Sequence, residues 1–238
     1  NVSAHIFGRA VRFRGTQGTA IVRVFDITAA LTGASEKTLK RLRRPYRKVY
    51  VHPTHHASYY PGAESMTLKV LFEPESGRLL GAQAAGGGGV DKRIDILSVA
   101  IQAGMTVFDL EEMELAYSPQ YGSAKDPVNM AGFVAAGLLR DDHPQVDVEG
   151  ASRPGNLVVD VRTPEEYRNG HVPGAINIPL ETLRARLHEL PKDRDIVVYC
   201  QVGQRGYLAT RILRQAGYAA ANLGGGYKGY QMVHEVSL

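Results

Sequence analysis

The pattern of apolar residues changes near the middle of this 238-residue chain, and that change constrains the fold more than any other feature. Before it, apolar and polar residues alternate along short stretches, as in strands with one side in water. After it, short runs are apolar throughout, as in strands buried on both faces. A polar segment with two prolines and two glycines, residues 140–155, lies between the two patterns. The sequence therefore predicts two domains of ordinary size, residues 1–139 and residues 140–238.

The first domain is predicted to be an antiparallel sheet with helices added to it, an α+β fold. Residues 1–8 read as the second half of a helix that ends at Gly8, so we expect the chain to be a fragment of a longer one. Strands are expected where apolar residues alternate, and helices where a cap residue or a helical period appears. The expected strands are 20–28, 48–52, 66–72 and 79–85, and the expected helices are 35–42, 91–103 and 128–139.

The second domain is predicted to be an α/β fold, a mostly parallel sheet with helices on both faces. One helix start is well marked, because Thr163 can cap it, Pro164 suits the first position and two glutamates follow at its positive end. The expected strands are 157–161, 175–178, 195–199 and 219–223, with 145–148 as a candidate edge strand. The expected helices begin at 163 and span 180–190, 204–217 and 227–236.

Composition excludes several classes of protein. The chain is 44% hydrophobic and has no apolar stretch approaching the ~20 residues of a membrane span, so no membrane partner is expected. The net charge is +4, but the densest basic run, residues 37–48, holds a single aromatic residue and no nucleic-acid motif follows it. We interpret that run as a solvated helix face, and the alternative is a docking patch for a phosphorylated ligand. No nucleic-acid partner is expected.

The single cysteine, Cys200, excludes an internal disulfide and any cysteine-only metal site. A free thiol also favours the reducing cytoplasm as the location of the protein. Three histidines, His52, His55 and His56, lie close together in the sequence, but no carboxylate or cysteine completes a ligand set with them. A surface loop without a metal is therefore expected there.

Cys200 comes directly after an expected strand of the second domain, and residues 201–206 lead from it into a helix. Ligands of open α/β sheets bind beyond the carboxyl ends of the strands. Loop N–H groups and a helix N-terminus carry positive partial charges there, and Arg205 adds a full one, so the thiolate form is favoured. Gly203 and Gly206 permit the tight backbone that such a cradle needs. The alternative is a buried structural cysteine.

Three segments of the second domain, Asp160–Pro179, Val198–Gly206 and Leu223–Gly226, resemble a rhodanese domain from end to end. The resemblance implies a sulfurtransferase whose cysteine, here Cys200, carries a sulfane sulfur as a persulfide. It also implies substrates such as thiosulfate, a persulfide or coenzyme A persulfide. The loop that would hold the sulfur consists of Gln201, Val202, Gly203, Gln204 and Arg205. Rhodaneses often have Trp after the glycine pair; this chain has none, and Tyr230 is the expected substitute.

Two alternatives to sulfur transfer stay open at this point. Phosphatases of similar architecture typically have five residues between the cysteine and the arginine, whereas four separate Cys200 from Arg205, which argues against a cysteine phosphatase. The second alternative is a catalytically silent rhodanese that acts as a binding or regulatory module. The intact Cys200 argues against it.

The first domain resembles the C-terminal dimerisation domain of flavin-dependent pyridine nucleotide-disulfide reductases, as found in coenzyme A-disulfide reductases fused to a rhodanese. Phe13–Ile21, Gly89–Asp95 and Ala116–Asn129 carry the resemblance. It implies a homodimer formed through this domain, and FAD, NAD(P)H and coenzyme A as cofactors of the full-length parent. That parent would reduce a coenzyme A persulfide, a polysulfide or a disulfide.

The chain itself is expected to bind none of these cofactors. The glycine run Gly86–Gly89 lacks the Gly-x-Gly-x-x-Gly spacing of a dinucleotide site and predicts a tight turn. The family's dimerisation domain lends tyrosines to the active site of the partner subunit. The candidates by position are Tyr59 or Tyr60 and Tyr117 or Tyr121, and the sequence does not distinguish within either pair.

Overall fold

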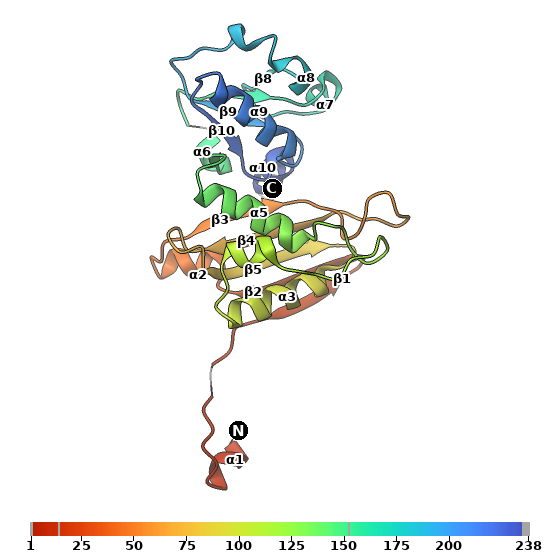
Figure 1. The fold of residues 1–238 in the computed structure, drawn as a ribbon, viewed down its shortest axis with the longest axis vertical. Helices are drawn as coiled ribbons and strands as arrows, with labels where there is room; N and C mark the ends of the chain where they lie inside the picture. The colour runs from red at the N-terminus through yellow and green to blue at the C-terminus, as the bar shows by residue number, and fades with distance from the viewer. Residues whose placement is uncertain (1, 14, 152, 235–238) are drawn as a thin grey trace.

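The computed structural model describes residues 2–13, 15–151 and 153–234, and it shows two sheets with their own helices, one after the other along the long axis (Figure 1). The short helix α1 (Val2–Ile6) lies apart from both, at the end of an extended segment. The described residues form no helix that is long and apolar enough to cross a membrane.

The first sheet is antiparallel, with the strand order β1-β2-β5-β4-β3. Helices α3 and α5 lie against the sheet, and apolar residues such as Leu68, Phe72 and Leu97 form the core between them. The strands are β1 (Ala20–Val24), β2 (Ile27–Gly33), β3 (Arg47–Val51), β4 (Met66–Phe72) and β5 (Leu79–Gly86). The helices are α2 (Glu36–Arg41), α3 (Val90–Gln102), α4 (Val107–Glu112) and α5 (Pro127–Leu139). The predicted α+β class is confirmed.

The stretch predicted as one strand, residues 20–28, is instead the start of a hairpin. Val24 pairs with Ile27, so Phe25 and Asp26 alone form the turn between β1 and β2. Phe25 has a φ of +51°, a left-handed conformation that usually falls to glycine or asparagine in such turns. Because the sequence has no glycine at this point, the alternating pattern alone predicts a continuous strand.

The second sheet is parallel, with the strand order β6-β10-β9-β7-β8, so the predicted α/β class is confirmed as well. The strands are β6 (Gln145–Val146), β7 (Leu157–Asp160), β8 (Ile176–Asn177), β9 (Ile196–Tyr199) and β10 (Ala220–Leu223). The helices are α6 (Val148–Ala151), α7 (Pro164–Arg168), α8 (Leu180–Leu183), the 3-10 turn η1 (Leu187–Glu189), α9 (Gln204–Gln215) and α10 (Gly226–His234).

Three further details of the sequence prediction are wrong. The helix expected over 180–190 is divided into α8 and η1, and in this form Leu183 and Leu190 both reach the same core. Val148 begins helix α6 rather than continuing the edge strand β6. Helix α4 was not expected, although Thr106 and Asp109 form a capping box at its start. The last two residues of the helix expected over 227–236 lie outside the described residues.

A turn of three glycines, Gly224–Gly226, joins the two domains in space. A Cβ on Gly225 would lie 3.1 Å from Tyr50 Cβ, on strand β3 of the first domain. A Cβ on Gly226 would lie 2.5 Å from the carbonyl oxygen of Cys200, in the second domain. Both glycines have a positive φ, +76° and +60°, which L side chains rarely adopt. The turn therefore fits closely between the strand of one domain and the loop of the other.

Candidate active site

Cys200 lies at the carboxyl end of β9, and its side chain is buried, with 1% of the residue exposed. The backbone N–H of Gly203 donates a hydrogen bond to its Sγ, with an N–S distance of 3.2 Å. Helix α9 begins at Gln204, and its first internal bond runs from the Tyr207 N–H to the Gly203 carbonyl oxygen (2.8 Å). The N–H groups before that bond belong to the positive end of the helix, next to the sulfur.

The charge of Arg205 is shared with a carboxylate. Its guanidinium donates two hydrogen bonds to Glu166, Nη1 to Oε2 (2.8 Å) and Nη2 to Oε1 (2.6 Å). These bonds, more than any other cause, lower the pKa of Glu166 from 4.5 to about 2. The charge that Arg205 adds beside Cys200 is therefore offset in part by Glu166, a pairing that the sequence does not predict. Glu166 also closes the capping box with Thr163 at the start of α7.

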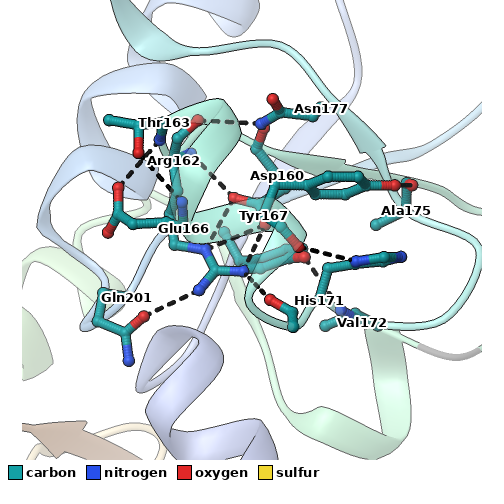
Figure 2. Close-up of polar contacts among 12 residues, drawn as sticks. Asp160, Arg162, Thr163, Glu166, Tyr167, His171, Val172, Ala175, Asn177 and Gln201 are labelled. Carbon is teal, nitrogen blue, oxygen red and sulfur yellow. Dashed lines mark hydrogen bonds and ion pairs between the residues drawn. The ribbon is translucent and has the colours of Figure 1, made fainter.

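A buried ion pair behind the loop holds the side chain of Gln201 (Figure 2). Arg162 and Asp160 are 2% and 0% exposed, and Arg162 Nη2 lies 2.7 Å from Asp160 Oδ2. The remaining donors of Arg162 reach Gln201 Oε1 (2.9 Å) and the carbonyl oxygen of Gly170 (2.6 Å), and its guanidinium lies over the Tyr227 ring at 4.2 Å. The pair thereby connects the end of β7 to the loop after β9.

The chain around this pair is fixed by further side-chain bonds (Figure 2). Asn177 donates to the carbonyl oxygens of Asp160 (3.0 Å) and Arg162 (2.9 Å). The Tyr167 hydroxyl donates to the carbonyl oxygen of Ala175 (2.6 Å). These bonds satisfy backbone groups in the loops after β7, so the segment that carries Arg162 is well supported.

Two family models match the chain. Residues 19–126 match the dimerisation domain of the pyridine nucleotide-disulphide oxidoreductases. Residues 146–232 match the rhodanese-like domain. The chain carries both domains. The family resemblance inferred from the sequence motifs is thereby confirmed.

Similar proteins contain the same two domains or one of them. Coenzyme A disulfide reductase of Staphylococcus epidermidis is 43% identical over 126 residues, which are 53% of this chain and 28% of that protein. The structure of reduced CoADR-RHD from Bacillus anthracis is 44% identical with a TM-score of 0.94, and the match covers 99% of this chain and 43% of that one. The structure of a NAD-dependent persulfide reductase from A. fulgidus is 39% identical with a TM-score of 0.86, and the match covers 96% of this chain and 42% of that one. The chain thus spans less than half the length of these proteins.

The dimerisation domain brings together one tyrosine from each expected pair. The hydroxyls of Tyr59 and Tyr117 lie 3.0 Å apart at the surface, and this hydrogen bond is the main cause that raises the pKa of Tyr117. Tyr60 instead packs edge-to-face on His56, with the ring centres 5.7 Å apart. Tyr121 is about as exposed as Tyr59, 70% against 75%, so exposure does not separate the candidates, but the hydroxyl contact does. Tyr59 and Tyr117 therefore form the better candidate pair for a shared site.

The glycine run of the dimerisation domain forms the bend between β5 and α3, over residues Gly87–Gly89. The side chains of Glu64 and His55 lie close to it: a Cβ on Gly87 would lie 1.8 Å from Glu64, and one on Gly88 would lie 3.3 Å from His55.

The histidines of the dimerisation domain are divided between two places. His55 and His56 hydrogen-bond to each other (2.8 Å), whereas His52 bonds to Thr67 (2.9 Å). His52 and His56 are both buried, so the expectation of a surface loop is wrong for these two residues. Burial, together with the charge of Lys228, lowers the pKa of His52 to about 4. Among the described residues no group of three or more His, Cys, Asp or Glu side chains could hold a metal ion.

Proposed function

We propose that the rhodanese-like domain transfers sulfane sulfur through a persulfide on Cys200. The observation that carries the proposal is the Cys200 thiol at the start of a tight loop, with a backbone N–H donor 3.2 Å from its sulfur and the N-terminus of α9 beside it. Backbone donors and a helix N-terminus stabilise an anion at this place, first the thiolate and then the persulfide.

The reaction proceeds by two displacements on sulfur. The Cys200 thiolate attacks the outer sulfur of thiosulfate, the S–S bond of the donor breaks, and sulfite leaves with the electron pair. A thiolate acceptor, or cyanide in an assay, then attacks the outer sulfur of the Cys200 persulfide. The S–S bond to Cys200 breaks, the new persulfide or thiocyanate leaves, and the Cys200 thiolate is restored. No external oxidant or reductant takes part.

The residues of the loop have different tasks in this proposal. The backbone N–H groups from Gln201 to Arg205, including Val202 and Gln204, would face the transferred sulfur, and the Gly203 N–H already donates to Cys200 Sγ. Gly203 permits the turn, because its φ of +108° is rarely adopted by other residues. The Arg205 guanidinium attracts an anionic donor such as thiosulfate. Its ion pair with Glu166 weakens that attraction.

In a longer parent protein, this sulfur transfer would serve a FAD- and NAD(P)H-dependent reductase acting on a coenzyme A disulfide, a persulfide or a polysulfide. Two similar proteins, named coenzyme A disulfide reductase and persulfide reductase, support this reading. The rhodanese-like domain would then supply or accept the sulfane sulfur, and the cytoplasm is the proposed location. Tyr59 and Tyr117 would act in the reductase site of the partner subunit.

We also place a homodimer contact on the dimerisation domain. The hairpin of β1 and β2 exposes several large apolar side chains, more than a lone soluble domain usually leaves in water. They are Ile21, Val22, Val24, Phe25 and Ile27, each more than half exposed. A second copy would cover this surface.

Replacement of Cys200 tests the transfer itself. Cys200→Ser should abolish thiocyanate formation from thiosulfate and cyanide, because a hydroxyl cannot carry a sulfane sulfur. The unmodified chain should gain about 32 Da, the mass of one sulfur atom, on incubation with thiosulfate alone. Thiocyanate formation by the variant at a near wild-type rate would refute the proposal. Hydrolysis of p-nitrophenyl phosphate by the wild-type chain would favour the phosphatase alternative instead.

A further inference from the structure

Asn222 is a polar side chain in an otherwise apolar and buried strand. It lies on β10, between Ala221 and Leu223, and 3% of it is exposed. Its Oδ1 is buried and has no hydrogen-bond partner among the described residues. Burying an unpaired amide oxygen costs free energy, and an apolar side chain of the same size would avoid that cost. The amide of Asn222 therefore calls for an explanation other than the packing of the sheet.

The other end of the amide points at the sulfur-binding loop. Asn222 Nδ2 donates a hydrogen bond to the Gly203 carbonyl oxygen (3.0 Å), which also accepts from the Tyr207 N–H (2.8 Å). The orientation of the amide is defined, because the reversed amide would place two oxygen atoms against each other. Gly203 is also the residue whose N–H donates to Cys200 Sγ. One residue of the loop thus connects Asn222 to the sulfur.

The space for this contact depends on a second glycine. A Cβ on Gly206 would lie only 2.2 Å from Asn222 Oδ1. Gly206 does not need its conformational freedom, because its φ is not positive. Its lack of a side chain leaves room for the amide of Asn222 beside the first turn of α9.

From this arrangement we propose that Asn222 is a positioning residue for sulfur transfer: it holds the Gly203 carbonyl and thereby fixes the turn at Gly203, whose N–H faces the sulfur. Both bonds meet at Gly203: its N–H donates to Cys200 Sγ and its carbonyl oxygen accepts from Asn222. A change in the backbone conformation of Gly203 would therefore disturb both contacts. The inference rests on the proposed transfer at Cys200, but its main test does not need turnover.

Alkylation of Cys200 by iodoacetamide provides that test, because the chain has a single cysteine. In Asn222→Leu, the alkylation rate at pH 7 should fall about threefold, because misdirected N–H groups stabilise the thiolate less. At pH 10, well above the ordinary range for a cysteine thiol, the two rates should agree. The kcat for sulfur transfer should fall about tenfold, less than the loss of a donor outright would cost. The free energy of unfolding should stay the same or rise, since an unpaired buried oxygen is removed.

Two further variants keep the test decisive. Asn222→Ala covers the case in which leucine is too large beside Gly206, and Gly206→Ala displaces the amide from the other side. The effects of these two changes on alkylation should not add in the double variant, because both act through one contact. Asn129→Asp is the matched control: Asn129 is a buried asparagine that donates to the carbonyl oxygens of Leu110 and Met113, far from Cys200 in the sequence.

The experiments distinguish a failure of the role of Asn222 from a failure of the proposed sulfur transfer. Wild-type alkylation rates at both pH values in Asn222→Leu and Asn222→Ala would overturn the role of Asn222, whatever the transfer assay shows. An equal fall in the alkylation rate of Asn129→Asp would show that general destabilisation causes the effect, and it would overturn the role of Asn222 as well. A wild-type chain that transfers no sulfur would refute the proposed function, while the alkylation rates would still decide the role of Asn222.

Discussion

Each domain contains a buried arginine–aspartate pair with the same closest distance, 2.7 Å, yet the two pairs are connected to different things. Arg93 and Asp126 lie in the dimerisation domain, and the other donors of Arg93 reach the carbonyl oxygens of His55 (2.6 Å) and Gly89 (3.2 Å). Asp126 also caps helix α5. This pair joins three segments of the dimerisation domain to one another, and none of the hydrogen bonds described for it reaches a candidate catalytic side chain.

The pair in the rhodanese-like domain has one connection that its counterpart lacks. Arg162 donates to the side chain of Gln201, the residue after Cys200. A buried ion pair by itself says little about stability or function, because its Coulomb energy is largely offset by desolvation. The remaining donors of each arginine therefore decide its role. Those of Arg93 hold the dimerisation domain together, and those of Arg162 position the loop after Cys200.

The most complete way to test this division is to separate the domains. Cutting the chain between Leu139 and Arg140, the proposed boundary, should leave sulfur transfer in the C-terminal piece and none in the N-terminal piece. The N-terminal piece should self-associate through its exposed hairpin, and the C-terminal piece should be monomeric, since its sheet is covered on both faces. Sedimentation and a thiosulfate assay on each piece check this. A folded C-terminal piece without transfer would show that the dimerisation domain supports the active loop.

Matched substitutions in the two ion pairs give the next largest effect. Arg93→Lys and Arg162→Lys both lose the bidentate geometry, so each should lower the free energy of unfolding by about 2 kcal/mol. Below the unfolding transition, however, Arg93→Lys should transfer sulfur at the wild-type rate, whereas Arg162→Lys should have a lower kcat. Denaturant unfolding and steady-state kinetics at one temperature separate the two effects. Equal kcat values in both variants would remove the functional distinction between the pairs.

A smaller effect is expected from the exposed ion pair at the loop. Arg205→Ala should slow transfer from thiosulfate about tenfold, less than a fully buried donor would, because about a third of the side chain is exposed. Transfer from an uncharged alkyl trisulfide should change much less. Glu166→Gln should speed the reaction with thiosulfate, because it leaves the guanidinium charge uncompensated. Equal losses for both donors in Arg205→Ala would show that the charge does not act on the incoming anion.

The smallest effect concerns acid stability. The pKa of Glu166 is about 2 in the folded chain and 4.5 otherwise, so folding favours the ionised form. Its contribution is fully present above pH 4.5 and is lost as the pH falls through about 2. The difference in unfolding free energy between wild type and Glu166→Gln should therefore be constant above pH 4.5, at most about 1 kcal/mol, and vanish near pH 2. A difference that grows on acidification would contradict the assignment.

The sequence predicted those features that depend on neighbours along the chain. The helix start at Thr163, the strand before Cys200 and the glycine turn after β5 all follow from local pattern. The bond between Arg205 and Glu166 was not predicted, because the two residues are 39 positions apart and their approach depends on how β7 and β9 pair. Asn222 was missed for the same reason, although a polar residue within an apolar strand was a visible signal.

The glycine turn Gly224–Gly226 has a consequence for how such fusions can be altered. On one side, the N–H groups of Tyr227 and Lys228 donate to the carbonyl oxygens of Cys200 (2.8 Å) and Gln201 (3.0 Å). On the other side, Gly225 has a φ of +76°, and a Cβ there would lie only 3.1 Å from Tyr50 Cβ. A foreign rhodanese grafted onto this dimerisation domain would need glycine at that position. A larger residue would push its catalytic loop away from strand β3 of the dimerisation domain. Exchange of modules between such enzymes is thus limited by the fit at this one turn, even where the linker has ample length.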